Sequence, residues 1–261
     1  MKRSGQPELI EELLVLAEGI AQKAGELLSN RPETFDVNQK SSVRDFATHM
    51  DHASEKLIVS EILAARPGDG IIGEEGAARM STSGITWVID PIDGTVNYFY
   101  NLPGWNISIA AKDEKGVLIG IVYAPTLNSL WRASRGGGAY LNDRLIHVSN
   151  TDALNESLIA TGFSYDLAER VRQGEKIAEL IPKVRDIRRN GAAAVDLCHV
   201  ASGAVDGYFE TGLKEWDLAA GGLIAREAGA LVTGRMGAPA GEAMVIAAGP
   251  ALHALLIREI G

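Results

Sequence analysis

Two aspartates that follow an apolar run are the residues of this chain best suited to chemistry. Residues 87–95 read WVIDPIDGT, so a strand-like segment leads directly into Asp90, and Pro91 and Gly94 favour a turn around Asp93. Two carboxylates three residues apart on a rigid turn can converge on one point. Magnesium prefers such hard oxygen ligands in a near-octahedral set. The stretch therefore predicts a Mg²⁺ site rather than an ordinary Asp-rich turn.

Other oxygens and amides of the same turn extend this prediction. We expect Asp90 to bridge two ions and the backbone carbonyl of Ile92 to add a further ligand. A helix that begins at Gly94 and Thr95 would point free N–H groups toward the same place, which favours a bound phosphate. Carboxylates clustered around divalent cations would also allow a chain with a net charge of -9 to handle an anionic substrate.

Three more acidic positions are ambiguous when only their local sequence is considered. Glu74 follows the apolar residues 71–72 and repeats the layout of a strand followed by carboxylates, although a glutamate pair there is also typical of a solvated strand edge. Asp217 begins a predicted helix, where N-capping or complementing the helix dipole is the simpler interpretation. Asp51 has the same interpretation in an earlier helix, three residues after Thr48 in a capping-box pattern.

The composition excludes several classes of protein. The chain has 261 residues, of which 46% are hydrophobic and 23% charged, which is ordinary for a globular protein that buries a sizeable core. A net charge of -9 argues against a nucleic-acid binder. We find neither an apolar secretory signal nor a membrane-spanning window, so we expect a cytoplasmic protein without a membrane. The single Cys198 predicts a buried thiol rather than a nucleophile.

The apolar periodicity predicts the elements that must position these residues. Helices are expected over residues 7–30, 48–65, 166–182, 192–201, 216–228 and 251–260. Strands are expected over residues 71–72, 86–89, 107–111, 117–123, 205–209 and 244–248, and residues 40–42 have the composition of a loop. This order predicts an α/β (α+β) fold with two lobes, residues 1–150 carrying most of the metal ligands and residues 151–261 completing the substrate site.

The acidic motifs together resemble those of the inositol monophosphatase family. The matching segments run from about residue 8 to the C-terminus. They are Lys40, the D-x-x-T-x-x-D pattern of Asp45, Thr48 and Asp51, GEE at 73–75, WVIDPIDGT at 87–95, GAAAVDLC at 191–198, YFETG at 208–212 and WD at 216–217. The resemblance implies a layered α/β/α/β/α sandwich of the inositol monophosphatase and fructose-1,6-bisphosphatase type. It also implies a lithium-sensitive, Mg²⁺-dependent phosphatase with two or three ions per active site, commonly a homodimer.

The same resemblance implies roles for individual residues. The ligands of one metal ion would be Glu74, Asp90 and the carbonyl of Ile92, and those of the second Asp90, Asp93 and Asp217. Thr95 and Asp51 resemble the pair that orients the attacking water, with Glu74 as its activator. The positions that resemble substrate contacts are Asp93, Gly94, Thr95, Gly191, Ala193, Glu210 and Asp217.

The motifs specify the chemistry more closely than the substrate. We expect inositol monophosphate, because Glu210 and the GAAAVDLC segment look more like the inositol branch than the histidinol branch. Histidinol-phosphate phosphatase, fructose-1,6-bisphosphatase and nucleotide 3'-phosphatase are the enzymatic alternatives, and a binding partner of the transcription or translation machinery is the non-enzymatic one. A basic run at residues 183–189 predicts a solvated or subunit-contact surface, with a site for a second phosphate as the alternative.

Overall fold

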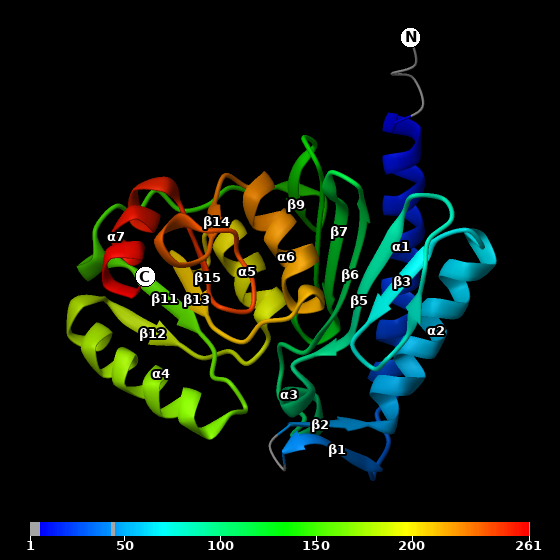
Figure 1. Cartoon of the computed structure of the whole chain (residues 1–261), viewed down its shortest axis with the longest axis horizontal. Coiled ribbons are helices and arrows are strands. Elements are labelled where there is room, and N and C mark those ends of the chain that lie inside the picture. The colour runs from blue at the N-terminus through cyan, green and yellow to red at the C-terminus, as the bar shows by residue number, and fades with distance from the viewer. Residues whose placement is uncertain (1–5, 43–44, 261) are drawn as a thin grey trace.

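The computed structural model describes residues 6–42 and 45–260, which fold into alternating layers of helices and sheets (Figure 1). Three pairs of helices enclose two sheets: α1 (Gln6–Ser29) with α2 (His49–Ala65), α5 (Ala193–Ala201) with α6 (Glu215–Glu227), and α4 (Leu167–Leu180) with α7 (Pro250–Ile260). This α/β/α/β/α arrangement confirms the expected fold class. Within these residues no helix is long and apolar enough to cross a bilayer.

The larger sheet has the strand order β10-β9-β8-β7-β6-β5-β3-β4. Its strands are β3 (Gly70–Gly73), β4 (Ala78–Arg79), β5 (Thr86–Asp93), β6 (Asn106–Asp113), β7 (Gly116–Ala124), β8 (Ser129–Ser134), β9 (Gly138–Leu141) and β10 (Arg144–Leu145). Only the β3–β5 pair of this sheet is parallel among the described strands. The carboxyl ends of β3 and β5 therefore lie at the same edge of the sheet, which brings Glu74 and the aspartates after Ile89 together.

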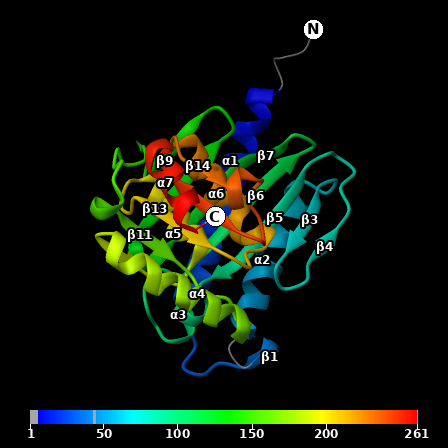
Figure 2. The same ribbon diagram turned by 60° about the vertical axis from the view of Figure 1, so that its left-hand side comes forward.

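The smaller sheet has the order β12-β11-β13-β15-β14. Its strands are β11 (Leu158–Thr161), β12 (Asp186–Arg188), β13 (Gly207–Glu210), β14 (Leu231–Thr233) and β15 (Val245–Ala248). In Figure 2, α4 and α7 come to the front and cover the outer face of this sheet. A separate hairpin pairs β1 (Val37–Ser42) with β2 (Asp45–Thr48), and the short α3 (Thr95–Phe99) follows β5.

Strand alternation decides which layer each apolar side chain joins. On β5, Trp87 and Ile89 pack with α1 and α2, whereas Val88 between them packs with α5 and α6. On the smaller sheet, Tyr208 packs with the central helices and Phe209 with α7. Three apolar cores thus fill the four spaces between the five layers, because the central core lies on both sides of α5 and α6.

Three sequence expectations for the backbone are wrong. Residues 40–42 belong to strand β1, because pairing with β2 overrides their loop-like composition. Strand β5 does not stop at Asp90: its pairing with β6 is irregular between Asp90 and Asp93 and then resumes, with Asp93 opposite Asn106. The irregularity accommodates Pro91, which has no N–H to donate. Glu210, expected just after a strand, is the last residue of β13.

Candidate active site

A cavity of about 580 Å³ lies where the two sheets and the central helices meet. It is lined by residues from β5, the turn after β3, the loops after β11 and β12, the end of β13 and the start of α6. Every site residue expected from the sequence lines it except Asp51, which is fully buried behind Thr95. These lining residues are Glu74, Asp90, Ile92, Asp93, Gly94, Thr95, Gly191, Ala193, Glu210 and Asp217.

Three aspartates form the centre of the cavity. Asp90 and Asp93 lie on β5, and Asp217 lies in the first turn of α6, yet one carboxylate oxygen from each falls within 4.8 Å of the others. Asp90 is 2% exposed and Asp93 7%, while Asp217 is half-buried. Neither local stretch predicts this meeting, because only the packing of α6 against the larger sheet brings Asp217 to β5.

The electrostatics of this triad are those of carboxylates held close together away from water. Burial, followed by repulsion from Glu74 and the neighbouring aspartates, raises the pKa of Asp90 well above its usual value. Burial likewise raises the pKa of Asp217, and it raises that of Asp93 to about 6 even though hydrogen bonds to Asp93 oppose the shift. Like charges this close repel unless protons or cations lie between them. The oxygen-only donor set suits Mg²⁺, so the residues present fit a divalent cation.

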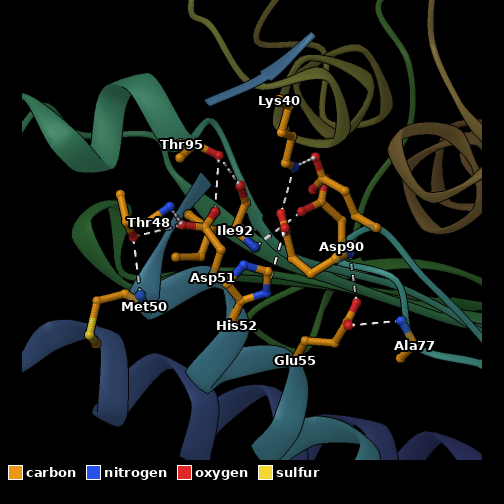
Figure 3. Close-up of polar contacts among 12 residues, drawn as sticks. Lys40, Thr48, Met50, Asp51, His52, Glu55, Ala77, Asp90, Ile92 and Thr95 are labelled. Carbon is orange, nitrogen blue, oxygen red and sulfur yellow. Dashed lines mark hydrogen bonds and ion pairs between the residues drawn. The ribbon is translucent and has the colours of Figure 1, made fainter. Parts of the chain in front are cut away.

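The turn after β3 holds Glu74 at the edge of the triad. Buried Glu55 of α2 accepts hydrogen bonds from the backbone N–H groups of Glu75 (2.9 Å) and Ala77 (3.0 Å), which fixes the turn (Figure 3). Lys40 of β1 reaches over it, with Nζ 2.8 Å from Glu74 Oε1 and 2.6 Å from Glu75 Oε1. The β1–β2 hairpin, which the sequence did not predict, therefore places the ammonium group of Lys40 at the predicted site.

Asp51, Thr48 and Thr95 form a network behind the cavity (Figure 3). Thr48 caps α2, and Asp51 Oδ2 accepts hydrogen bonds from both the N–H and the hydroxyl of Thr48 at 2.7 Å, so the predicted capping box is confirmed. The hydroxyl of Thr95 lies 3.2 Å from Asp51 Oδ1 and 3.1 Å from the carbonyl oxygen of Ile92. Asp51 therefore both caps a helix and holds the hydroxyl of a residue that lines the cavity.

Residues from the second half of the chain form the opposite wall. Gly191 and Ala193 lie before and at the start of α5, and the N–H of Ala193 donates to Asp93 Oδ1 at 3.2 Å. Glu210 accepts a hydrogen bond from the hydroxyl of Tyr208 at 2.6 Å. A Cβ on Gly162 would collide with the carboxylate of Glu210, so that close approach needs glycine.

Several lining residues were not predicted from the sequence. Arg189, part of the basic run, lines the cavity and would clash with a side chain at Gly191. Asp196 is buried in α5, where burial raises its pKa and Asn190 donates to it at 2.6 Å. A charged residue within the otherwise apolar GAAAVDLC segment was the signal for Asp196, whereas nothing local distinguishes Arg189 from its basic neighbours.

The predicted buried position of Cys198 is confirmed.

Comparison with known proteins agrees with this geometry. A model described as the Inositol monophosphatase family matches residues 9–261. The chain belongs to this family. Membership places it among phosphatases and confirms the resemblance seen in the acidic motifs.

Relatives and solved structures carry two kinds of name. The chain is 44% identical to a Nus factor SuhB of Xylella fastidiosa, covering 84% of this chain and 81% of that protein. It is 37% identical to an inositol-1-monophosphatase of Mycobacterium leprae, covering 96% and 94%. The crystal structure of the Bartonella henselae extragenic suppressor protein suhB superposes with a TM-score of 0.90 at 32% identity, covering 95% of this chain and 98% of that one.

Proposed function

We propose that this protein is a Mg²⁺-dependent phosphomonoesterase that releases phosphate from inositol monophosphate or a similar small polyol phosphate. The observation that carries the proposal is the convergence of Asp90, Asp93 and Asp217 within 4.8 Å at the centre of a cavity. Hydrolysis of phosphate monoesters is among the slowest uncatalysed reactions known, and a cluster of carboxylates can hold the divalent cations that accelerate it.

In this proposal two sets of oxygens hold two cations. One set would comprise Glu74, Asp90 and the carbonyl of Ile92, and the other Asp90, Asp93 and Asp217; a third cation is also part of the proposal. When bound, such cations neutralise the phosphate, acidify the attacking water and stabilise the leaving alkoxide. The protein keeps these oxygens fixed, since β5 and the capped start of α6 hold three of the side chains on rigid elements.

Asp51 and Thr95 would orient the attacking water, and Glu74 would accept its proton. The hydroxyl of Thr95 can donate to Asp51 Oδ1, 3.2 Å away, which leaves its oxygen lone pairs free to accept a hydrogen bond from water. Burial behind Thr95 protects this contact from competing solvent. The amides of Gly94 and Thr95 would hold the phosphate beside it.

The far wall would select the leaving group. Glu210 and the Gly191–Ala193 segment lie across the cavity from Glu74, on elements of the smaller sheet and the central helices. A carboxylate can accept hydrogen bonds from two neighbouring hydroxyls, which suits a polyol. It can also pair with an ammonium group, so histidinol phosphate stays an alternative substrate, as do fructose 1,6-bisphosphate and nucleotide 3'-phosphates.

A second function has specific support from the relatives. Proteins named Nus factor SuhB match 84% of this chain at up to 44% identity, so a role as a binding partner of the transcription machinery is the second candidate. The two functions are compatible, because the aspartate cavity occupies only one part of the molecule's surface. A homodimer remains part of the proposal.

Phosphate release with a panel of inositol, histidinol and sugar phosphates tests the enzymatic proposal. We expect turnover that needs Mg²⁺ and is abolished by EDTA. Asp217→Asn should reduce turnover at least about 100-fold. Mutating a residue that only supports a metal ligand already costs about 10- to 100-fold, and Asp217 is proposed as a ligand itself. Glu215→Gln is the matched control, because Glu215 lies on the same helical turn but pairs with Lys112 outside the cavity.

Wild-type activity in Glu215→Gln with loss in Asp217→Asn would support the cation assignment. Near wild-type turnover of Asp217→Asn at saturating Mg²⁺ would contradict it. A wild-type protein without activity on the whole panel would favour the second candidate.

A further inference from the structure

Asn106 lies beneath the aspartate triad at the first residue of β6. It is fully buried, and it stands directly opposite Asp93 where the pairing of β5 and β6 resumes after the irregularity at Pro91. Its Nδ2 donates to Asp93 Oδ2 at 2.8 Å and lies 3.4 Å from the Asp93 carbonyl oxygen. Asn106 does not line the cavity, so it acts on the site only through Asp93.

The carboxylate of Asp93 receives three hydrogen bonds. Oδ2 accepts from Asn106 and from the N–H of Ala194, both at 2.8 Å, and Oδ1 accepts from the N–H of Ala193 at 3.2 Å. A carboxylate has about four lone-pair positions. By this count both positions on Oδ2 are used, and the one that stays available is on Oδ1.

The oxygen of the Asn106 side-chain amide lies in an energetically unfavourable environment. Its Oδ1 is buried and has no hydrogen-bond partner among the described residues. Turning the amide over would not help, because it would place two acceptor oxygens against each other at Asp93. A buried acceptor without a partner destabilises a fold, so an asparagine that served only the fold would be poorly placed here.

We propose that Asn106 is a positioning residue that locks the Asp93 carboxylate so that Oδ1 is presented to a divalent cation. The proposal rests on the proposed function, in which Asp93 is a cation ligand. Hydrogen bonds from residues behind a metal ligand fix its orientation, and removing one typically lowers metal affinity 10- to 100-fold. Without Asn106 the carboxylate keeps two backbone donors but loses one of the two bonds that hold Oδ2.

Two variants and one control separate this role from a structural one. Asn106→Ala removes the amide, and Asn106→Val removes it while filling more of the space with a residue that suits a strand. Trp131→Phe is the control, because Trp131 Nε1 in β8 is the other buried side-chain polar atom without a partner in the part of the chain that is described. Calorimetric titration of the metal-free proteins gives the Mg²⁺ Kd, and thermal unfolding in EDTA gives Tm.

We expect the Mg²⁺ Kd to rise at least about tenfold in both Asn106 variants. In Asn106→Val the Tm in EDTA should change little, because losing the hydrogen bond to Asp93 and losing the unpartnered oxygen have opposite effects on stability. Turnover should recover toward wild type at saturating Mg²⁺, with the KM for substrate unchanged. Trp131→Phe should leave the Kd unchanged whatever it does to Tm.

Three results would overturn the role of Asn106. The first is an unchanged Mg²⁺ Kd in both Asn106 variants, and the second is an equal rise of the Kd in Trp131→Phe. The third is a Kd that rises only in those variants whose Tm falls. Failure of wild type to bind Mg²⁺ would instead overturn the proposed function itself, so the two failures are distinguishable.

Discussion

Two polar neighbours of Glu210 counteract part of the rise in its pKa that burial causes. Burial raises the pKa of Glu210 to about 7, and the Tyr208 hydroxyl and the nearby charge of Arg189 limit the rise. A group with this pKa is protonated below pH 7 and ionised above it. If Glu210 accepts hydrogen bonds from substrate hydroxyls as a carboxylate, its contribution to binding grows as the pH passes 7.

We therefore expect the KM of wild type for inositol 1-phosphate to fall, relative to that of Glu210→Gln, between pH 6 and pH 8. Above pH 7 the variant should lose about 1 kcal/mol of binding to a polyol, and about 1.5–3 kcal/mol to a cationic substrate such as histidinol phosphate. The measurement is KM against pH at saturating Mg²⁺ for both proteins. Parallel profiles would show that Glu210 does not contact the substrate in its ionised form.

A second variant checks the cause of this pH dependence. Tyr208→Phe removes the hydroxyl that stabilises the Glu210 carboxylate, so the fall in KM should move to higher pH. A profile that does not move would assign the titration to another group.

At the scale of elements, the crossing of α5 and α6 determines the position of the site. The first amides of α5 hold Asp93, and the first turn of α6 carries Asp217. Gly221 lies where the helices touch, and a Cβ on it would be 3.0 Å from both the carbonyl oxygen of Ala194 and the Cβ of Leu197. A side chain at residue 221 would therefore require α5 and α6 to move apart by a few tenths of an ångström.

Gly221→Ala should consequently separate α5 from α6 and disturb the triad. Overpacking costs about 1–3 kcal/mol, which equals or exceeds the gain of about 1 kcal/mol from replacing glycine within a helix. We expect lower stability to urea and weaker activation by Mg²⁺. Gly174→Ala is the matched control: Gly174 is exposed in the middle of α4 with open space around it, so it should gain up to about 1 kcal/mol and keep wild-type activity. Equal behaviour of the two variants would contradict the tight crossing.

At the scale of the molecule, one core joins the two halves of the chain. Its buried members come from both sheets and from α5 and α6, for example Val88, Val122, Ala194, Leu223 and Val245. The sequence predicts lobes at residues 1–150 and 151–261, and the larger sheet ends with β10 while the smaller begins with β11. Neither half can bury this core alone.

We predict that the chain unfolds in one cooperative transition rather than as two lobes. Urea unfolding followed by tryptophan fluorescence and by far-ultraviolet circular dichroism should give coincident curves. Mg²⁺ at 100 times its Kd should shift the whole curve by about 2.7 kcal/mol, since Asp90 and Asp93 lie in the first half and Asp217 in the second. Two separated transitions, of which Mg²⁺ moves only one, would contradict this prediction.

Local patterns determined much of this molecule from the sequence alone. The apolar periods located both N-terminal helices and the central strands, because burying one face imposes its period on the residues. The capping box of Thr48 and Asp51 was visible because both partners lie within one helical turn. The WVIDPIDGT stretch predicted two carboxylates beside one another for the same reason: their spacing is set by adjacent residues.

Tertiary structure alone decided how distant residues meet. The local sequence around Asp217 favours an ordinary helix-start carboxylate, and only the packing of α6 on the larger sheet brings it to Asp90 and Asp93. Asn106 stands opposite Asp93 because strand pairing resumes after Pro91, a register that no local pattern specifies. Lys40 reaches Glu74 from a hairpin whose composition suggested a loop. Such contacts depend on pairing and packing between segments far apart in the chain, which leave no periodic signature in either segment.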